Sequence, residues 1–363
     1  MLVALLLSAS ASGASLVPAD AEGALVLQSA AGLRAMLDTA GRRASALSPD
    51  AVGGMLRDRV GVDLLAEERQ WSLLPRGPRA LVFTRDSIGL SAPVTNAKVA
   101  LAALSAWLGP SRPTRPKPLK GPLAAGNRAG MIAPVGGSQR LLTASGRHAA
   151  ALVSAMAHPS PFSRDKALLS HATGPSWLYL KGDGPLRAAL FAIDASAAGL
   201  TARGLVVPVR DPILAGGAPG PCEGAPTGCL RAGLGPSGRG LLSLVLGKLE
   251  KSLPAGDSVV VRLDGIDLQQ LAGDRSLPRA LRISATSADP QPGPSLAGQL
   301  DLAGIDAALS KLSPLDALRG SMAAGAYAVH LLYGPLLRNA GPLTVTGAAA
   351  KSGAELELHL PLR

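Results

Sequence analysis

ALVFTRDSIGLSAP, residues 80–93, has the pattern of two short β-strands joined by the two-residue turn Arg85-Asp86. A second pair follows at residues 130–135 and 140–144, where Gly136-Gly137 is a turn sequence typical of hairpins. Strands joined by such short turns must lie antiparallel, because a parallel connection needs a dozen or more residues. These two pairs therefore predict a mostly antiparallel sheet.

Further strands and helices are expected on both sides of these hairpins. Apolar side chains at helical spacing predict helices at residues 49–58, 96–108, 147–157, 240–252 and 314–323. Runs of β-type residues predict strands at residues 191–196, 200–209, 280–288, 327–333, 343–346 and 355–360. Strand pairs with helices between them predict an α+β fold.

A strand–turn–helix pattern recurs along the chain, at residues 24–37, 176–190, 258–271 and 298–309. In each case a short oxygen-bearing side chain stands where a helix would begin, namely Ser29, Asp183, Asp267 and Asp306. Because the tripeptide Gly-Ile-Asp also occurs twice, we expect two related modules. The predicted order is a signal segment at 1–15, a first module at 16–160 and a second module at 165–363.

Positive charge is concentrated in one part of the chain. The net charge is +11, from 36 Lys and Arg against 25 Asp and Glu, yet residues 87–164 contain no Asp or Glu. Four basic residues of the proline-rich segment 109–122, together with one after it, are candidates for binding an anionic polymer or lipid headgroups: Arg112, Arg115, Lys117, Lys120 and Arg128. A solvated loop of biased composition is the simpler interpretation of the segment. Nucleic acid is not expected, since aromatic residues for base stacking are scarce.

The beginning of the chain and its cysteines both favour export. Residues 2–7 are an unbroken apolar run followed by small residues, as in a secretory signal peptide. Cys222 and Cys229 lie in a Gly/Pro-rich segment and favour a local disulfide in an oxidising compartment. No stretch of the mature chain matches a transmembrane span, because the most apolar one, residues 320–337, contains His330 and the pair Gly334-Pro335.

One group of motifs carries a family resemblance. The opening Leu16-Val-Pro-Ala-Asp20, a strand, a Leu-rich helix and the segment Gly61-Val-Asp63-Leu before Trp71-Ser-Leu-Leu-Pro resemble a family of exported bacterial proteins with a domain of unknown function. Ala21 stands where that family has Thr. The resemblance covers mainly residues 16–92, and it implies export but no catalytic residues.

The sequence shows no catalytic constellation, and we expect no metal or cofactor. Its five histidines form no H-E-x-x-H motif and no close pair on one helix face. We therefore expect a non-enzymatic exported protein of the cell envelope that binds an anionic polymer or lipid. Two alternatives stay open: a hydrolase with a dispersed site around Ser237 or His148, and a carrier of an apolar ligand.

Overall fold

The structure of the chain is a computed structural model of all 363 residues. It describes residues 13–28, 30–63, 65, 71–74, 77–109, 121–158, 165–173, 176–217, 227–248, 252–256, 258–264, 281–286, 294–317 and 321–362. The chain divides into two compact units. The first consists of residues 1–34, 49–182 and 189–194, and the second of residues 35–48, 183–188 and 195–363.

The first unit is built on an antiparallel sheet with strand order β7-β1-β2-β3-β6-β5-β4. Its strands are β1 (Gly23–Leu27), β2 (Arg79–Thr84), β3 (Ser87–Pro93), β4 (Leu123–Ala125), β5 (Arg128–Val135), β6 (Ser138–Gly146) and β7 (Ser176–Lys181). Its helical segments are η1 (Ala14–Leu16), α3 (Pro49–Val60), α4 (Ala97–Leu108), α5 (Ala149–Ala157) and α6 (Lys166–Leu169). Helix α2 (Ala31–Gly41) has residues in both units, and η2 (Ser45–Leu47) belongs to the second.

Two predicted hairpins of this unit are confirmed. β2 pairs with β3 around Arg85-Asp86, and β5 pairs with β6 around Gly136-Gly137. Both glycines of the second turn have positive φ, 60° and 79°, a conformation that side chains disfavour. Helix α4 begins where predicted, because the Asn96 side chain accepts hydrogen bonds from the first backbone amides of the helix.

Helices cover both faces of the first sheet. Leu90 and Ala92 of β3 lie in a buried cluster with Leu104 of α4. Gly89, which points to the opposite face of the same strand, lies under Leu152 and Met156 of α5. The alternation of side chains along β3 therefore places an apolar core on each side of the sheet.

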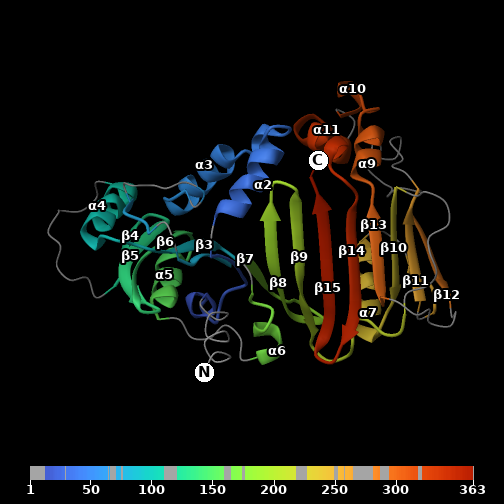
Figure 1. The fold of residues 1–363 in the computed structure, drawn as a ribbon, viewed down its shortest axis with the longest axis horizontal. Helices are drawn as coiled ribbons and strands as arrows, with labels where there is room; N and C mark the ends of the chain where they lie inside the picture. The colour runs from blue at the N-terminus through green and yellow to red at the C-terminus, as the bar shows by residue number, and fades with distance from the viewer. Residues whose placement is uncertain are drawn as a thin grey trace. The chain divides into compact units, whose positions relative to one another are not determined.

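The second unit also contains an antiparallel sheet, with strand order β12-β11-β10-β13-β14-β15-β9. Its strands are β9 (Gly199–Pro208), β10 (Gly228–Gly233), β11 (Ser258–Leu263), β12 (Leu281–Thr286), β13 (Leu296–Leu300), β14 (Leu343–Ala350) and β15 (Gly353–Pro361). β8 (Leu186–Ser196) stands next to β9 in the strand order and has residues in both units. The helices are α7 (Pro236–Lys248), α9 (Leu302–Leu309), α10 (Pro314–Ala317) and α11 (Ser321–Asn339), of which α9, α10 and α11 pack together beyond one end of β13 and β14 (Figure 1).

The predicted mixed α+β fold with antiparallel pairing is thus confirmed. A similar order of elements, a strand followed by helices and two strands, occurs twice in the chain: β1-α2-α3-β2-β3 and β13-α9-α10-α11-β14-β15. In both cases the leading strand pairs with the first strand after the helices.

The helix predicted at residues 185–190 is wrong, because Pro185 lies in a turn and residues 186–190 form the start of β8. Asp183 does not cap a helix. Its carboxylate accepts a hydrogen bond from the amide of Gly184, whose φ is 61°, and the two residues form a turn before the strand. Pairing within a sheet here outweighs the local helix propensity of an Ala-rich segment.

The strand predicted at residues 327–333 is also wrong. These residues lie in the middle of α11, a helix of 19 residues that continues through Pro335. Apolar side chains without clear alternation cannot distinguish a strand from a helix, and here packing against α9 and α10 decides the outcome.

Two predicted helix starts are corrected as well. Asp301, and not Asp306, precedes α9, so Asp306 lies inside the helix and is fully buried. Helix α7 begins at Pro236 rather than at residue 240. A proline suits the first helical position, where no intrahelical partner for a backbone N–H exists. Residues Ser29 and Asp267 lie outside the described residues.

Candidate functional site

The predicted basic cluster is only partly described. Arg112, Arg115, Lys117 and Lys120 lie outside the described residues. Arg128, at the start of β5, donates from Nη1 to the backbone oxygen of Trp107 over 3.2 Å, and its guanidinium carbon lies 5.1 Å from the centroid of the Trp107 ring. Arg128 therefore caps and stacks on the last turn of α4, and its binding to an anionic surface stays a prediction.

Arg140 of β6 is a second basic residue of the stretch that lacks acids, and it is only 2 % exposed. Its guanidinium donates to the hydroxyl of Ser91 over 2.8 Å, to the backbone oxygen of Ser91 over 3.1 Å and to the backbone oxygen of Pro78. Burial lowers the pKa of Arg140 to about 10, because desolvation disfavours the charged form. These contacts join β6, β3 and the segment before β2, so we interpret Arg140 as a structural residue.

The residues named for a dispersed hydrolase site have local structural roles. Ser237 is buried in the first turn of α7, where its amide donates to the backbone oxygen of Pro212 over 3.2 Å. The side chain of His148 is 64 % exposed, and its Nε2 lies 4.0 Å from a carboxylate oxygen of Asp86. Ser237 belongs to the second unit and His148 to the first, and a hydrolase site around either residue stays a prediction.

Asp306, which is fully buried, takes part in a polar cluster with the half-buried His330 and the exposed Arg338, and the sequence patterns did not indicate this cluster. One carboxylate oxygen lies 2.8 Å from Nδ1 of His330, and the other lies 3.2 Å from Nε of Arg338. All three residues lie in the second unit, with Asp306 on α9 and its two partners on α11. The cluster joins the two helices, and the only signal in the sequence was an Asp within an otherwise apolar helix.

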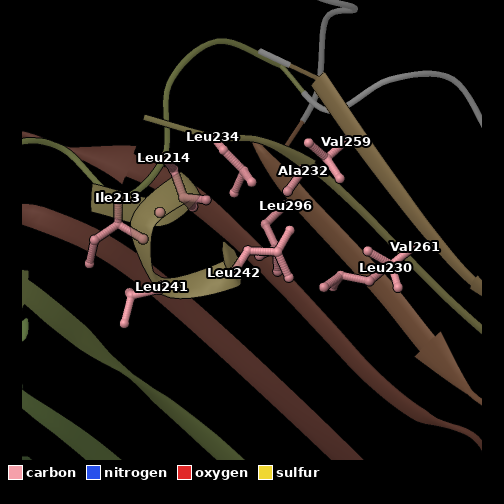
Figure 2. Close-up of a pocket in the computed structure, with 11 residues that line it drawn as sticks. Ile213, Leu214, Leu230, Ala232, Leu234, Leu241, Leu242, Val259, Val261 and Leu296 are labelled. Carbon is pink, nitrogen blue, oxygen red and sulfur yellow. The ribbon is translucent and has the colours of Figure 1, made fainter. Parts of the chain in front are cut away.

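The most distinctive feature of the second unit is an apolar pocket between α7 and the sheet, with a volume of about 240 Å³ (Figure 2). Eleven residues line it, all of them apolar: Ile213, Leu214, Leu230, Ala232, Leu234, Gly238, Leu241, Leu242, Val259, Val261 and Leu296. An interior of this composition offers dispersion contacts but no hydrogen bond from a side chain.

The floor of the pocket follows from the register of three neighbouring strands. Ala232 of β10 lies opposite Val259 of β11 on one side and opposite Leu296 of β13 on the other. Leu230 lies two residues before Ala232, so it occupies the same face of the sheet, opposite Val261. Ala232 has the smallest side chain of the row that it forms with Val259 and Leu296.

The wall formed by α7 is held away from the strands at its first turn. The amides of Gly235 and Ser237 donate to the backbone oxygens of Ile213 and Pro212. A side chain at Gly238 would collide with the backbone oxygen of Ile213, so this position requires glycine. The segment before β10 thereby anchors the helix. Leu241 and Leu242 of α7 both line the pocket, and Leu242 points toward Leu296 (Figure 2).

Sequence reasoning missed this pocket, although the signals for its walls were present. Leu230, Ala232 and Leu234 alternate on one face of a strand, and Leu241 and Leu242 form the apolar side of a helix. Such patterns indicate that surfaces face a core. They do not indicate whether the two surfaces meet or leave a space.

The predicted disulfide stays a prediction. Cys229 lies on β10, opposite Arg262 of β11 and Gln299 of β13, whereas Cys222 lies outside the described residues. Within the described part of the chain, no group of three or more His, Cys, Asp or Glu is arranged to hold a metal ion. None of the described helices is long and apolar enough to cross a membrane.

Comparison with known proteins adds little to this description. No protein-family model and no curated protein matches the chain. Two solved structures of the protein TP0453 show a distant similarity. Crystal form IV has 10 % sequence identity and a TM-score of 0.33, over 69 % of this chain and 90 % of that one. Crystal form I has 11 % identity and a TM-score of 0.32, over 69 % of this chain and 91 % of that one.

Proposed function

We propose that this protein is a carrier that binds an apolar ligand in the pocket of its second unit. The observation that carries the proposal is the pocket itself, in which all eleven lining residues are apolar. Binding of an apolar ligand in this pocket would remove the surface of the ligand and the walls of the pocket from water. This burial of apolar surface is the main favourable contribution to the free energy of such binding.

The size of the pocket restricts the class of ligand. A volume of about 240 Å³ exceeds the roughly 150 Å³ of a cavity that holds benzene, but it is below the roughly 300 Å³ at which pockets for drug-sized molecules begin. One medium-length hydrocarbon chain fits these limits better than a lipid with two chains. The preferred ligand is therefore a single-chain lipid.

The experiment is a binding titration of the full chain with an environment-sensitive apolar dye, followed by displacement with decanol. Wild type is expected to enhance the fluorescence of the dye with saturation, and decanol is expected to displace it. Ala232→Leu, which places three further carbon atoms over the pocket floor, is expected to weaken binding of both. Organic extraction of the purified protein with mass spectrometry would identify a ligand that is retained from the cell.

A matched control is available in the same core. Ala354 of β15 is fully buried in the same hydrophobic cluster but does not line the pocket. Ala354→Leu should leave dye binding unchanged in the fraction that folds. Equal binding by wild type and Ala232→Leu would place the dye elsewhere and overturn the proposal.

We also propose that the protein is exported to the cell envelope and is not an enzyme. Support comes from the signal-like segment at residues 1–15 and from the spacing of Cys222 and Cys229. Cell fractionation combined with thiol labelling tests the export. Recovery in the cytoplasm with both cysteines reduced would contradict it.

The third proposal is that the two units contain related modules. It is supported by the similar order of a strand, helices and two strands in the two element sets. Superposition of the two element sets in an experimental structure tests it. Different paths of the helices over the strands would argue for independent origins.

A further inference from the structure

The first described residues of the chain are part of the first unit. Residues 13–17 contain the short helix η1, and within them Gly13, Leu16 and Val17 are buried. The amide of Leu16 donates to the backbone oxygen of Gly13 over 3.1 Å, and the amide of Val17 donates to that of Ala14 over 3.4 Å. The fold therefore includes the chain from Gly13 onwards.

Gly13 packs against the sheet of the first unit. Val26 of β1 and Trp177 of β7 are register partners, and both are almost fully buried. A Cβ added to Gly13 would lie 2.5 Å from Cγ1 of Val26 and 3.4 Å from Cζ2 of Trp177. Removal of Gly13 would thus expose part of this apolar pair to water, which costs free energy.

The sequence just before this turn consists of small residues. Residues 8–15 read SASASGAS, so every position is small enough for the cleavage site of a secretory signal peptide. The pattern Ala-x-Ala, which is typical of such sites, occurs within this stretch only at Ala9-Ser10-Ala11. A second set of small residues, Ser12-Gly13-Ala14, overlaps the turn.

The fold discriminates between these two sites. Cleavage after Ala14 would remove the backbone oxygens that accept from Leu16 and Val17, together with the contact of Gly13 with the sheet. Cleavage after Ala11 would leave all of these contacts in the product. The choice therefore depends on the stability of the processed protein, which favours the earlier bond.

We propose that a signal peptidase cleaves the chain between Ala11 and Ser12. This inference rests on the proposed export and moves the end of the signal segment from residue 15 to residue 11. Water hydrolyses the amide bond, so that its hydroxyl joins the carbonyl carbon of Ala11 and its proton joins the amine of Ser12. The mature chain begins at Ser12 and keeps all of η1.

The test is the mass of the processed protein. The full chain is produced with a C-terminal affinity tag in a Gram-negative bacterium, and the tagged protein is purified separately from the envelope and the cytoplasm. Mass spectrometry of the intact protein and of its first peptide is expected to show a start at Ser12. An envelope form with any other start overturns the inference and leaves the export standing. Recovery only in the cytoplasm at full length overturns the proposed export itself.

Two substitutions of equal size form a matched pair. Ala11→Leu places a large side chain directly before the proposed bond, where a small residue is required, and is expected to abolish the start at Ser12. Ala14→Leu places the same side chain before the alternative bond and is expected to leave the start at Ser12. The reverse result, with processing lost only in Ala14→Leu, would assign the cleavage to the bond after Ala14 and overturn the inference.

The contribution of the turn to stability has a measurement of its own. Proteins that begin at Ser12 and at Ser15 are produced without the signal segment and unfolded by heat, with tryptophan fluorescence as the readout. The protein that begins at Ser15 is expected to melt about 2–4 °C lower, because it lacks two backbone acceptors and the contact with Trp177. Equal melting temperatures would show that Gly13 and Ala14 add nothing to the fold, which also overturns the inference.

Discussion

Substitution of Ala232 by Leu should stabilise the second unit if the added carbon atoms extend into the apolar pocket that this alanine lines. Ala232 is 3 % exposed and lies at the centre of the pocket floor. Enlarging a buried residue in a close-packed core normally destabilises a protein by roughly 1–3 kcal/mol. The sign of the effect therefore tests whether the pocket exists.

The expected magnitude follows from the three added carbon atoms. Each buried CH₂ contributes about 0.8 kcal/mol, and ordering a leucine side chain costs about 0.5–1 kcal/mol. The net gain is about 1.5 kcal/mol, which corresponds to a rise in melting temperature of about 5 °C for a unit of this size.

The assay is differential scanning calorimetry, with tryptophan fluorescence as an internal reference. Trp71, Trp107 and Trp177 are the three tryptophans of the chain, and all of them lie in the first unit. We expect the calorimetric transition of the second unit to rise and the fluorescence transition to stay unchanged. Ala354→Leu should instead lower the calorimetric transition. Destabilisation by both variants would mean that the pocket is filled core, and our reasoning would be wrong.

Three further predictions concern buried polar groups. Asp306→Ala should cost about 1–3 kcal/mol in urea unfolding, because it leaves the half-buried His330 without its hydrogen-bond partner, and an unchanged midpoint would contradict the role of this contact. Arg140→Lys should cost about 2 kcal/mol, since a lysine retains one of three hydrogen bonds, and a cost near zero would show that those bonds contribute little. Burial raises the pKa of Tyr179 above 10, so the unfolded chain loses this proton first and the contribution of Tyr179 to stability falls as pH rises above 10. Absorbance titration should show a late phenolate component that Tyr179→Phe removes, and its persistence in that variant would refute the assignment.

Prediction from the sequence succeeded where a local feature decides the conformation. The hairpin around Gly136-Gly137 was predictable because only glycine readily adopts two consecutive positive φ angles. The start of α4 was predictable because Asn96 satisfies backbone amides that no other part of the helix can reach.

Prediction from the sequence was wrong where contacts between distant parts of the chain determine the local conformation. The sequence predicts a strand at residues 327–333, but these residues are helical. Their helix packs against α9, and His330 contacts Asp306 of that helix. The sequence predicts a helix at residues 185–190, but residues 186–190 are extended. This conformation follows from the turn at Asp183-Gly184 and from the place of the segment in a sheet. In both segments short apolar runs were compatible with either periodicity.

Composition, turn residues and side-chain alternation were sufficient for the α+β class and the antiparallel pairing, since these follow from interactions between near neighbours in the chain. The pocket could only emerge from the folded structure. Its volume depends on the register that places Ala232 between Val259 and Leu296, and on the anchoring of α7 by the carbonyl groups of residues 212 and 213.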